Sequence, residues 1–292
     1  MHQLASTKSV LTRIAPVALL ATCLNLAVSA PPARAAGVQK TVKTTAQQAN
    51  TSAKPVAAAK PAAASDAQPT ADQLLKDSDR ARGAVKDGIS WEIDVQNFGE
   101  GTNNKVHYLV KVKGIDALAE ATAPARNKGE MMLFNDRTIW FFKPGIKKPV
   151  AISARQKLMG QAANGDIAST NYVRDYDGKL IGEDKVEGQD TWKLELKAKA
   201  KNVTYDGIRY WISKKDHLGV KAEFLTVSGE IFKTATFDYK NQLSLDGKKY
   251  PFVSRMTILD AHDPALKTII SYQSPKPQRL PDSIFNVNNL VR

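Results

Sequence analysis

The sequence predicts a mainly β fold built on an antiparallel sheet of about ten or eleven strands. Three observations lead to it: apolar and polar residues alternate in many segments, turn-forming pairs separate these segments, and few helical stretches lie between them. Strands joined by short turns must run antiparallel because parallel strands need long crossovers. A sheet of this size would curl into a barrel, a half-barrel or a sandwich.

The first predicted element is a helix. Thr70 and Gln73 have the spacing of a capping box, in which each residue satisfies a backbone N–H of the other, and the apolar Leu74 and Leu75 follow. This pattern predicts a helix from about residue 71 to Gly83, since glycine commonly ends helices.

From residue 89 the period changes to two. Ile89, Trp91, Ile93 and Val95 alternate with polar residues, and residues 106–112 repeat the pattern after a Gly- and Asn-rich turn, so the two segments predict a hairpin. Further strands are expected at 117–123, 130–135, 138–142, 179–186, 192–197, 207–213, 220–224, 230–239, 252–259 and 267–273. Only residues 153–172 interrupt this series of alternating segments, and they predict a short helix or an irregular flap.

The N-terminal third differs in composition from the rest of the chain. All aromatic residues lie at or after Trp91, and Lys8 and Arg13 precede an apolar run from Ile14 to Ala30. Ala33-Arg34-Ala35 then offers the small-x-small pattern that signal peptidase cleaves. We therefore expect a signal peptide over residues 1–35, a disordered Ala/Lys/Pro-rich linker over 36–69 and a single β domain over 70–292. A retained membrane anchor, or a lipoprotein lipidated on Cys23, is the alternative. Cleavage near Ala35 predicts that the chain leaves the cytoplasm.

Catalytic and metal-binding motifs are not evident. One cysteine excludes an intramolecular disulfide and a Cys-based zinc site, and the sequence has no nucleophile elbow, HExxH or phosphate loop. Asp175 and Asp177 could share a cation, although a turn is the plainer interpretation, and Ser254 with His262 is a candidate pair for a hydrolase. We expect no enzyme activity, no metal and no cofactor. The net charge of +13 is dispersed, so nucleic acid is not an expected partner.

Several short motifs follow one another in a recognisable order. Lys128-Gly129, Trp140 to Pro144, Arg155, Met159-Gly160 and Asp166-Ile167 come first, followed by Val186 to Leu196, Tyr210-Trp211-Ile212, Lys221 to Phe224 and Ser228-Gly229-Glu230. In this order they resemble the bacterial outer-membrane lipoprotein-sorting proteins, the LolA-like superfamily, over roughly residues 85–290.

The resemblance implies a strongly curved antiparallel sheet, a half-barrel whose concave face is covered by a few helices. It also implies a periplasmic carrier that binds the acyl chains of a lipid or lipoprotein in an apolar cavity and passes them to an envelope partner without catalysis or cofactor. An inner-membrane transporter is a further expected partner, and a monomer is the expected state.

The resemblance also suggests which residues bind the ligand. The candidates for the cavity lining are Trp140, Phe142, Met159, Trp192, Leu194 and Phe224, with a filled core position as the alternative for the aromatic residues among them. Residues 153–172 would form a movable cover. Lys147 and Lys148 could contact anionic lipid headgroups, or simply lie on a solvated loop.

Two other functions stay open at the level of sequence. The same fold could have a closed core and act as an envelope interaction module associated with an inner-membrane exporter, or it could be an envelope hydrolase whose residues meet only in the folded chain.

Overall fold

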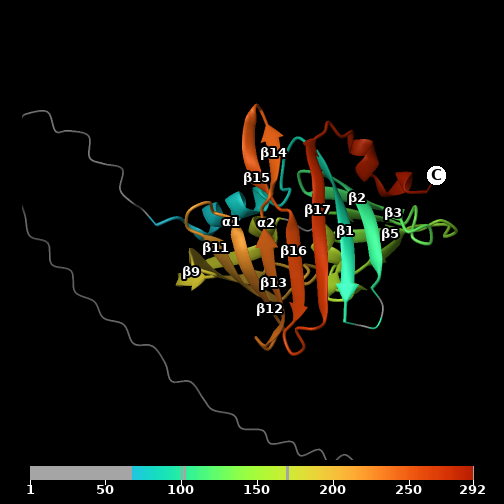
Figure 1. The fold of residues 1–292 in the computed structure, drawn as a ribbon. Coiled ribbons are helices and arrows are strands. Elements are labelled where there is room, and N and C mark those ends of the chain that lie inside the picture. The colour runs from blue at the N-terminus through green and yellow to red at the C-terminus, as the bar shows by residue number, and fades with distance from the viewer. Residues whose placement is uncertain (1–67, 100, 102, 169–170, 292) are drawn as a thin grey trace, which may run out of the picture. The chain divides into compact units, whose positions relative to one another are not determined.

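The computed structural model describes residues 68–99, 101, 103–168 and 171–291 (Figure 1). The predicted signal peptide, Cys23 and all but the last two residues of the predicted linker lie outside the described residues. No helix in the described part of the chain has the length and apolar character that crossing a membrane requires.

Helix α1 (Ala71–Arg80) begins with the predicted capping box. The Gln73 backbone N–H donates to Thr70 Oγ1 over 3.3 Å, and the Thr70 N–H donates to Gln73 Oε1 over 2.9 Å. The helix ends at Arg80, three residues before the predicted end at Gly83. Gly83 instead lies in a turn with φ of +114°, where a Cβ atom would come within 2.7 Å of the Trp91 ring. Glycine is therefore required by the packing of Trp91.

The main sheet contains thirteen antiparallel strands in the order β6-β5-β4-β3-β2-β1-β17-β16-β13-β12-β11-β10-β9. The first and last of its strands in the chain, β1 and β17, pair near its centre, as Figure 1 shows. The two halves of the chain therefore share one continuous sheet. The strands are β1 (Ile89–Phe98), β2 (Lys105–Lys113), β3 (Asp116–Ala123), β4 (Met131–Asn135), β5 (Thr138–Phe142), β6 (Val150–Ile152), β9 (Tyr176–Val186), β10 (Gln189–Ala198), β11 (Gly207–Ser213), β12 (Gly219–Leu225), β13 (Ile231–Asp238), β16 (Arg255–Asp260) and β17 (Lys267–Pro277).

The expected number of ten or eleven strands is too low. The main sheet has thirteen, and β6 is the strand among them that no expected segment covers. It has three residues, which is too short for alternation to be visible in the sequence. A separate hairpin, β14 (Asn241–Leu245) and β15 (Lys248–Phe252), turns at Asp246 and Gly247, which both have positive φ. This hairpin projects from the sheet next to α1 in Figure 1.

The described residues of 153–172 include short helical turns, as one expectation had it, together with short strands that were not expected. They contain a small two-stranded sheet of β7 (Lys157–Met159) and β8 (Ala162–Ala163), then the 3-10 helix η1 (Asn164–Ile167) and the start of α2 (Tyr172–Asp175). We call residues 156–168 the covering segment, because Ala162, Ala163 and Ile167 within it are almost completely buried.

The main sheet buries apolar residues on both faces. On the interior face, one large cluster joins β1–β5, β10–β13, β16 and β17 with α1 and the covering segment, and it includes Val110, Ala119, Leu194 and Phe224. On the outer face, a smaller cluster joins β3–β5 to the C-terminal segment with η2 (Asp282–Phe285) and η3 (Val287–Asn289). The outer cluster comprises Leu118, Leu133, Phe142, Leu280, Phe285 and Leu290.

The capping box gives a direct test of how α1 begins. We expect Thr70→Ala to lower the free energy of unfolding by about 1 kcal/mol, because the N–H of Gln73 loses its acceptor. Thr70→Ser keeps a hydroxyl and should lose much less. Equilibrium urea unfolding of the three chains measures the difference, and equal losses for Ala and Ser would show that the cap does not contribute.

Candidate functional site

The interior face is uneven where β2, β3 and β4 lie side by side. Strand β3 presents Ala117, Ala119 and Ala121 to this face, and these alanines pair with larger residues such as Met132 on β4 and Tyr108 on β2. Because alanine fills much less space than its neighbours, the sheet leaves a hollow between the larger side chains that another segment has to fill.

The covering segment packs into the interior cluster through Ala162 and Ile167, and it is held by polar contacts of Gln161 and Asp166. Gln161 donates its N–H to Thr268 Oγ1 over 2.7 Å, and its carbonyl oxygen accepts a hydrogen bond from Lys233 Nζ over 2.6 Å. The Asp166 carboxylate accepts hydrogen bonds from the Tyr205 hydroxyl and the Ala163 N–H, each near 2.8 Å. These contacts fix the segment to β13, β17 and the loop before β11.

Two of these anchoring groups are charged: Asp166 is buried and Lys233 is half-buried. Burial raises the pKa of Asp166, although the cation of Lys233 opposes the rise. Burial also lowers the pKa of Lys233, and Asp166 opposes that change. The two side chains therefore stabilise each other's charged form in a place where either charge alone would be costly.

An apolar pocket of about 210 Å³ stays open between the sheet and the covering segment. Its walls are apolar or aromatic side chains from five different strands, and polar residues stand among them. The apolar part of the lining consists of Tyr108 on β2, Met132 on β4, Phe141 on β5, Ile152 on β6 and Leu158 on β7, and the polar part of Glu130, Gln156, Lys157 and Asn164. A lining of this composition suits the apolar part of an amphiphile.

A second, polar region lies in the interior beneath α1. The Arg82 guanidinium is 4 % exposed and stands 4.4 Å from the centre of the Tyr172 ring and 5.2 Å from that of Phe237. Asp79 accepts a hydrogen bond from the Val173 N–H over 2.9 Å, which joins α1 to α2. Burial raises the pKa of Asp79 to about 7. These contacts fix the position of α2, and the residues do not reach the apolar pocket.

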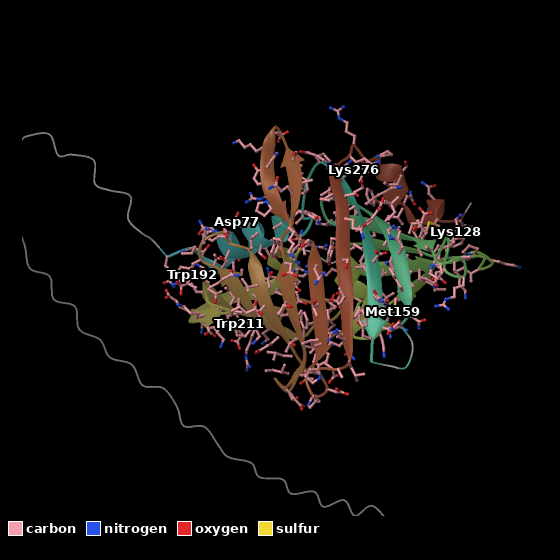
Figure 2. The ribbon with its side chains drawn as sticks, in the orientation of Figure 1. Asp77, Lys128, Met159, Trp192, Trp211 and Lys276 are labelled. Atoms are coloured by element: carbon pink, nitrogen blue, oxygen red, sulfur yellow. The ribbon has the colours of Figure 1, made fainter. Side chains whose placement is uncertain are left out.

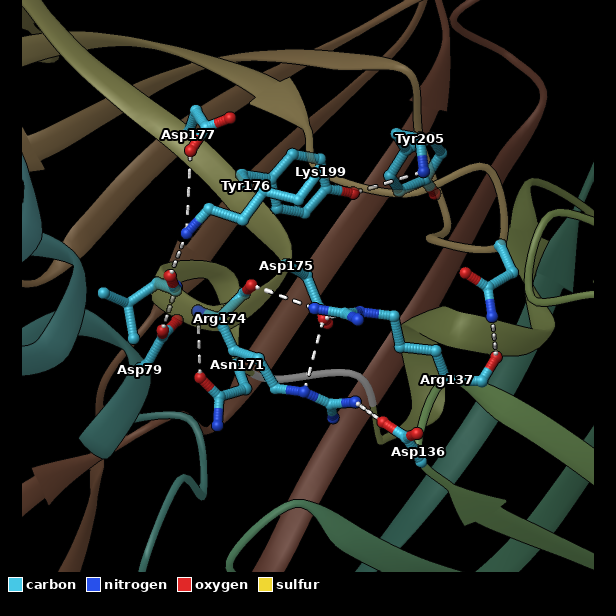
Figure 3. A network of polar contacts seen from close by, with 12 residues as sticks. Asp79, Asp136, Arg137, Asn171, Arg174, Asp175, Tyr176, Asp177, Lys199 and Tyr205 are labelled. Carbon is cyan, nitrogen blue, oxygen red and sulfur yellow. Dashed lines mark hydrogen bonds and ion pairs between the residues drawn. The ribbon is translucent and has the colours of Figure 1, made fainter.

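Around α2, Figure 3 shows a network of ion pairs at the turn between β4 and β5. Arg137 Nε lies 2.8 Å from Asp175, and Arg174 lies 2.8 Å from Asp136. The two carboxylates considered as a cation site have separate basic partners: Asp175 pairs with Arg137, and Asp177 lies 3.8 Å from Lys199. Within the described residues, no three metal-ligating side chains gather in one place.

The candidate hydrolase pair is not brought together in the structure. Ser254 donates its hydroxyl to the carbonyl oxygen of Asp238 over 3.1 Å, at the start of β16. The His262 ring lies in the turn that follows β16, 3.7 Å from Glu230 and 3.9 Å from Asp260. Each side chain therefore has partners of its own.

The six predicted ligand-binding residues are dispersed. Leu194 and Phe224 are fully buried on the interior face, and the Phe224 ring stacks on Tyr205 with centroids 3.9 Å apart. Trp192 is half-buried with Lys214 Nζ 4.2 Å from its ring, and Met159 is half-buried in β7. Figure 2 shows Trp192 and Met159 well apart.

Trp140 and Phe142 lie elsewhere, on the outer face, where they contact the C-terminal segment. None of the six lines the 210 Å³ pocket. Their role in ligand binding stays a prediction.

Sequence reasoning missed most of the pocket lining. Tyr108 could have been predicted, because the alternation over 106–112 places it on the buried face of its strand. Phe141, however, alternates with Trp140 and Phe142 in a segment that is apolar throughout, so periodicity could not assign its face. Ile152 and Leu158 lie in strands of three residues that carry no pattern.

Comparison with known proteins gives a consistent picture. A family model described only as an uncharacterized protein matches residues 114–292, and no curated protein matches the chain. A LolA superfamily protein from Nitrosomonas europaea has a solved structure with 29% sequence identity and a TM-score of 0.68, covering 76% of this chain and 100% of its own.

Two further solved structures share the fold. A putative outer membrane lipoprotein-sorting protein domain from Vibrio parahaemolyticus has 21% identity and a TM-score of 0.64, covering 76% of this chain and 98% of its own. A DUF1329 family protein from Desulfovibrio piger has 21% identity and a TM-score of 0.62, covering 75% of this chain and 97% of its own.

The buried Asp79 makes stability depend on pH. Because its pKa is raised from 3.8 to about 7, its contribution is favourable below about pH 4 and is lost as the pH rises through about 7. We therefore expect the free energy of unfolding of Asp79→Asn, minus that of the parent chain, to increase by up to about 4 kcal/mol as the pH rises from about 4 to about 7. Urea unfolding across the pH range measures this. The exposed Asp87→Asn is the control, and a difference for Asp79→Asn that does not change with pH would contradict the expectation.

Proposed function

Because the chain belongs to the LolA-like superfamily of bacterial lipoprotein-sorting proteins, we propose that it is a carrier of acyl chains. In this proposal it binds the acyl part of a lipid or lipoprotein in an apolar cavity and passes it to an envelope partner without catalysis. The observation that carries the proposal is the apolar pocket between the covering segment and β2, β4, β5 and β6.

The chemistry of the pocket supports an acyl ligand. Five apolar or aromatic side chains line it, and each methylene transferred from water to such a surface contributes about 0.8 kcal/mol. The polar lining, formed in part by Glu130, Gln156 and Lys157, would face the polar end of the ligand. Neither cofactor nor catalytic group is needed for this mode of binding.

The size of the pocket bears on how the ligand enters. At about 210 Å³ it is smaller than the roughly 300 Å³ at which typical small-molecule pockets begin, so it would hold only part of a long chain. The carrier proposal therefore includes movement of the covering segment, with the sheet strongly curved as a half-barrel and helices on its concave side. Movement would expose more of the interior face, which carries Trp192, Leu194 and Phe224, and would also free Met159 of the covering segment itself. For Trp140 and Phe142, a ligand role would require the C-terminal segment to move.

The location in the cell is part of the same proposal. Export by the signal peptide over residues 1–35, with cleavage near Ala35, would place the β domain in the periplasm at the end of a flexible linker. Lipidation of Cys23 would instead tether it to a membrane. An inner-membrane transporter and an acylated lipoprotein are the proposed partners.

An envelope interaction module is the second candidate, and one observation favours it. Much of the interior is already filled, since Leu194 and Phe224 have no exposed surface and Tyr205 stacks on Phe224. A core of this kind could present a fixed surface to an inner-membrane exporter without ever holding a lipid.

Filling the pocket distinguishes the two candidates. We expect Ile152→Trp to weaken binding of a fluorescent fatty acid about tenfold, because excluding two methylenes costs roughly 1.6 kcal/mol. Leu158→Trp, on the opposite wall, should act in the same direction. Titration of the ligand into the purified chain gives the dissociation constants.

The matched control is Ile181→Trp on the edge strand β9, where Ile181 is 44 % exposed and outside the pocket. It should bind as the parent chain does. Parent-like binding by both pocket variants would argue against this pocket, and a well-folded parent chain that takes up no fatty acid would favour the interaction module.

A further inference from the structure

Two loops meet at the edge of the sheet beside the apolar pocket. Residues 124–130 connect β3 to β4, and residues 143–149 connect β5 to β6. The loops touch each other, since a Cβ atom placed on Gly129 would lie 3.1 Å from Pro144 Cγ. The pocket adjoins both loops, because its lining includes Glu130 of the first loop and Phe141 and Ile152 on the two strands that the second loop connects.

These loops carry a concentration of positive charge. We call five exposed side chains on them the basic collar: Arg126, Lys128, Lys143, Lys147 and Lys148. Figure 2 shows Lys128 on the opposite side of the domain from Asp77 and Trp192. Because the two loops touch each other, the five charges form one local surface.

The positive charge of the collar is not neutralised within the described part of the chain. No ion pair there joins a collar side chain to a carboxylate, and Arg126 contacts only the side-chain oxygens of Asn104 and Asn127. The one carboxylate in the two loops, Glu130, is half-buried and accepts a hydrogen bond from Asn127 Nδ2 over 2.9 Å. The collar is thus a surface that an anionic partner would complement.

An apolar residue lies directly beside this charge. Val150 follows the second loop, stands on the edge strand β6 and is 50 % exposed. It pairs with Phe141, whose side chain lines the pocket. Basic groups, an exposed apolar side chain and the pocket therefore occur together on one edge of the sheet.

We infer that the basic collar docks this edge of the protein on the surface of an anionic phospholipid bilayer. Lysine and arginine side chains bind the phosphate layer, while an apolar side chain such as Val150 can enter the boundary with the acyl chains. An acidic protein or a nucleic acid would match the charge alone and leave Val150 without a partner. Docking would place the pocket at the membrane from which an acyl chain is taken or to which it is delivered. This role of the docking rests on the proposed carrier function.

Vesicle binding tests the inference. The purified chain is mixed with vesicles of phosphatidylcholine alone, or of phosphatidylcholine mixed equally with phosphatidylglycerol, and the bound fraction is measured by flotation. We expect binding to the anionic vesicles only, weakening as salt is added. Replacing four collar lysines by glutamine (Lys128, Lys143, Lys147 and Lys148) should weaken it at least about tenfold, since each basic group near such a surface is worth roughly fivefold.

A control variant carries the same change of charge elsewhere. Replacing the exposed Lys197, Lys201, Lys248 and Lys249 by glutamine should leave vesicle binding within about twofold of the parent chain, because these residues lie outside the two collar loops, on β10, in the loop after it and on β15. Equal losses in the two variants would overturn the inference, and so would equal binding of the parent chain to neutral and anionic vesicles.

Parallel measurements separate this inference from the carrier proposal. Uptake of a fluorescent fatty acid without docking on anionic vesicles would overturn the docking alone, whereas docking without uptake would support it and count against the carrier. Binding of monomeric lysophosphatidylglycerol distinguishes docking on a bilayer from binding of a single lipid headgroup. If the collar variant loses affinity for this soluble lipid but not for vesicles, the collar binds the headgroup of a cargo and the bilayer inference is overturned.

Discussion

The apolar interior face of the thirteen-stranded sheet has to be covered, and the way in which residues 156–168 cover it determines the rest of the structure. Few helical residues are available for the purpose, so a segment of short strands and one 3-10 helix packs into the interior cluster. Its anchors are the buried Asp166 and the half-buried Lys233, whose charges are tolerated there because each has polar partners. The apolar pocket lies between the covering segment and the sheet, where the two do not fill the space.

Much of this architecture can be predicted from the sequence, because alternation has a simple physical cause. A strand with one buried face shows a period of two, as in Ile89 to Val95, and the capping box at Thr70 and Gln73 marks the start of α1. Elements of two or three residues carry no period, which is why β6, β7 and β8 were not expected. The hairpin of β14 and β15 shows its turn at Asp246-Gly247, but its strands are polar at most positions.

The functional site could be predicted less well than the fold. Alternation tells which residues of one strand share a face, but it does not tell which face of each strand belongs to the interior. In β5, Trp140 and Phe142 were the conspicuous aromatics, whereas Ile139 and Phe141 are the residues that contribute to the interior cluster. The reason is that β3–β5 are buried on both sides, by the covering segment on one and by the C-terminal segment on the other. The sequence pattern of a single strand does not reveal that its second face is also buried.

Native mass spectrometry of the protein purified from its own cell envelope tests the central claim most directly. If the interior pocket serves an acyl ligand, the folded chain should carry a lipid or acylated peptide in stoichiometric amount, which organic extraction would then identify by class. A homogeneous protein with no bound molecule, purified under conditions that preserve weak complexes, would contradict the carrier account. It would instead favour a closed module whose function lies on its surface.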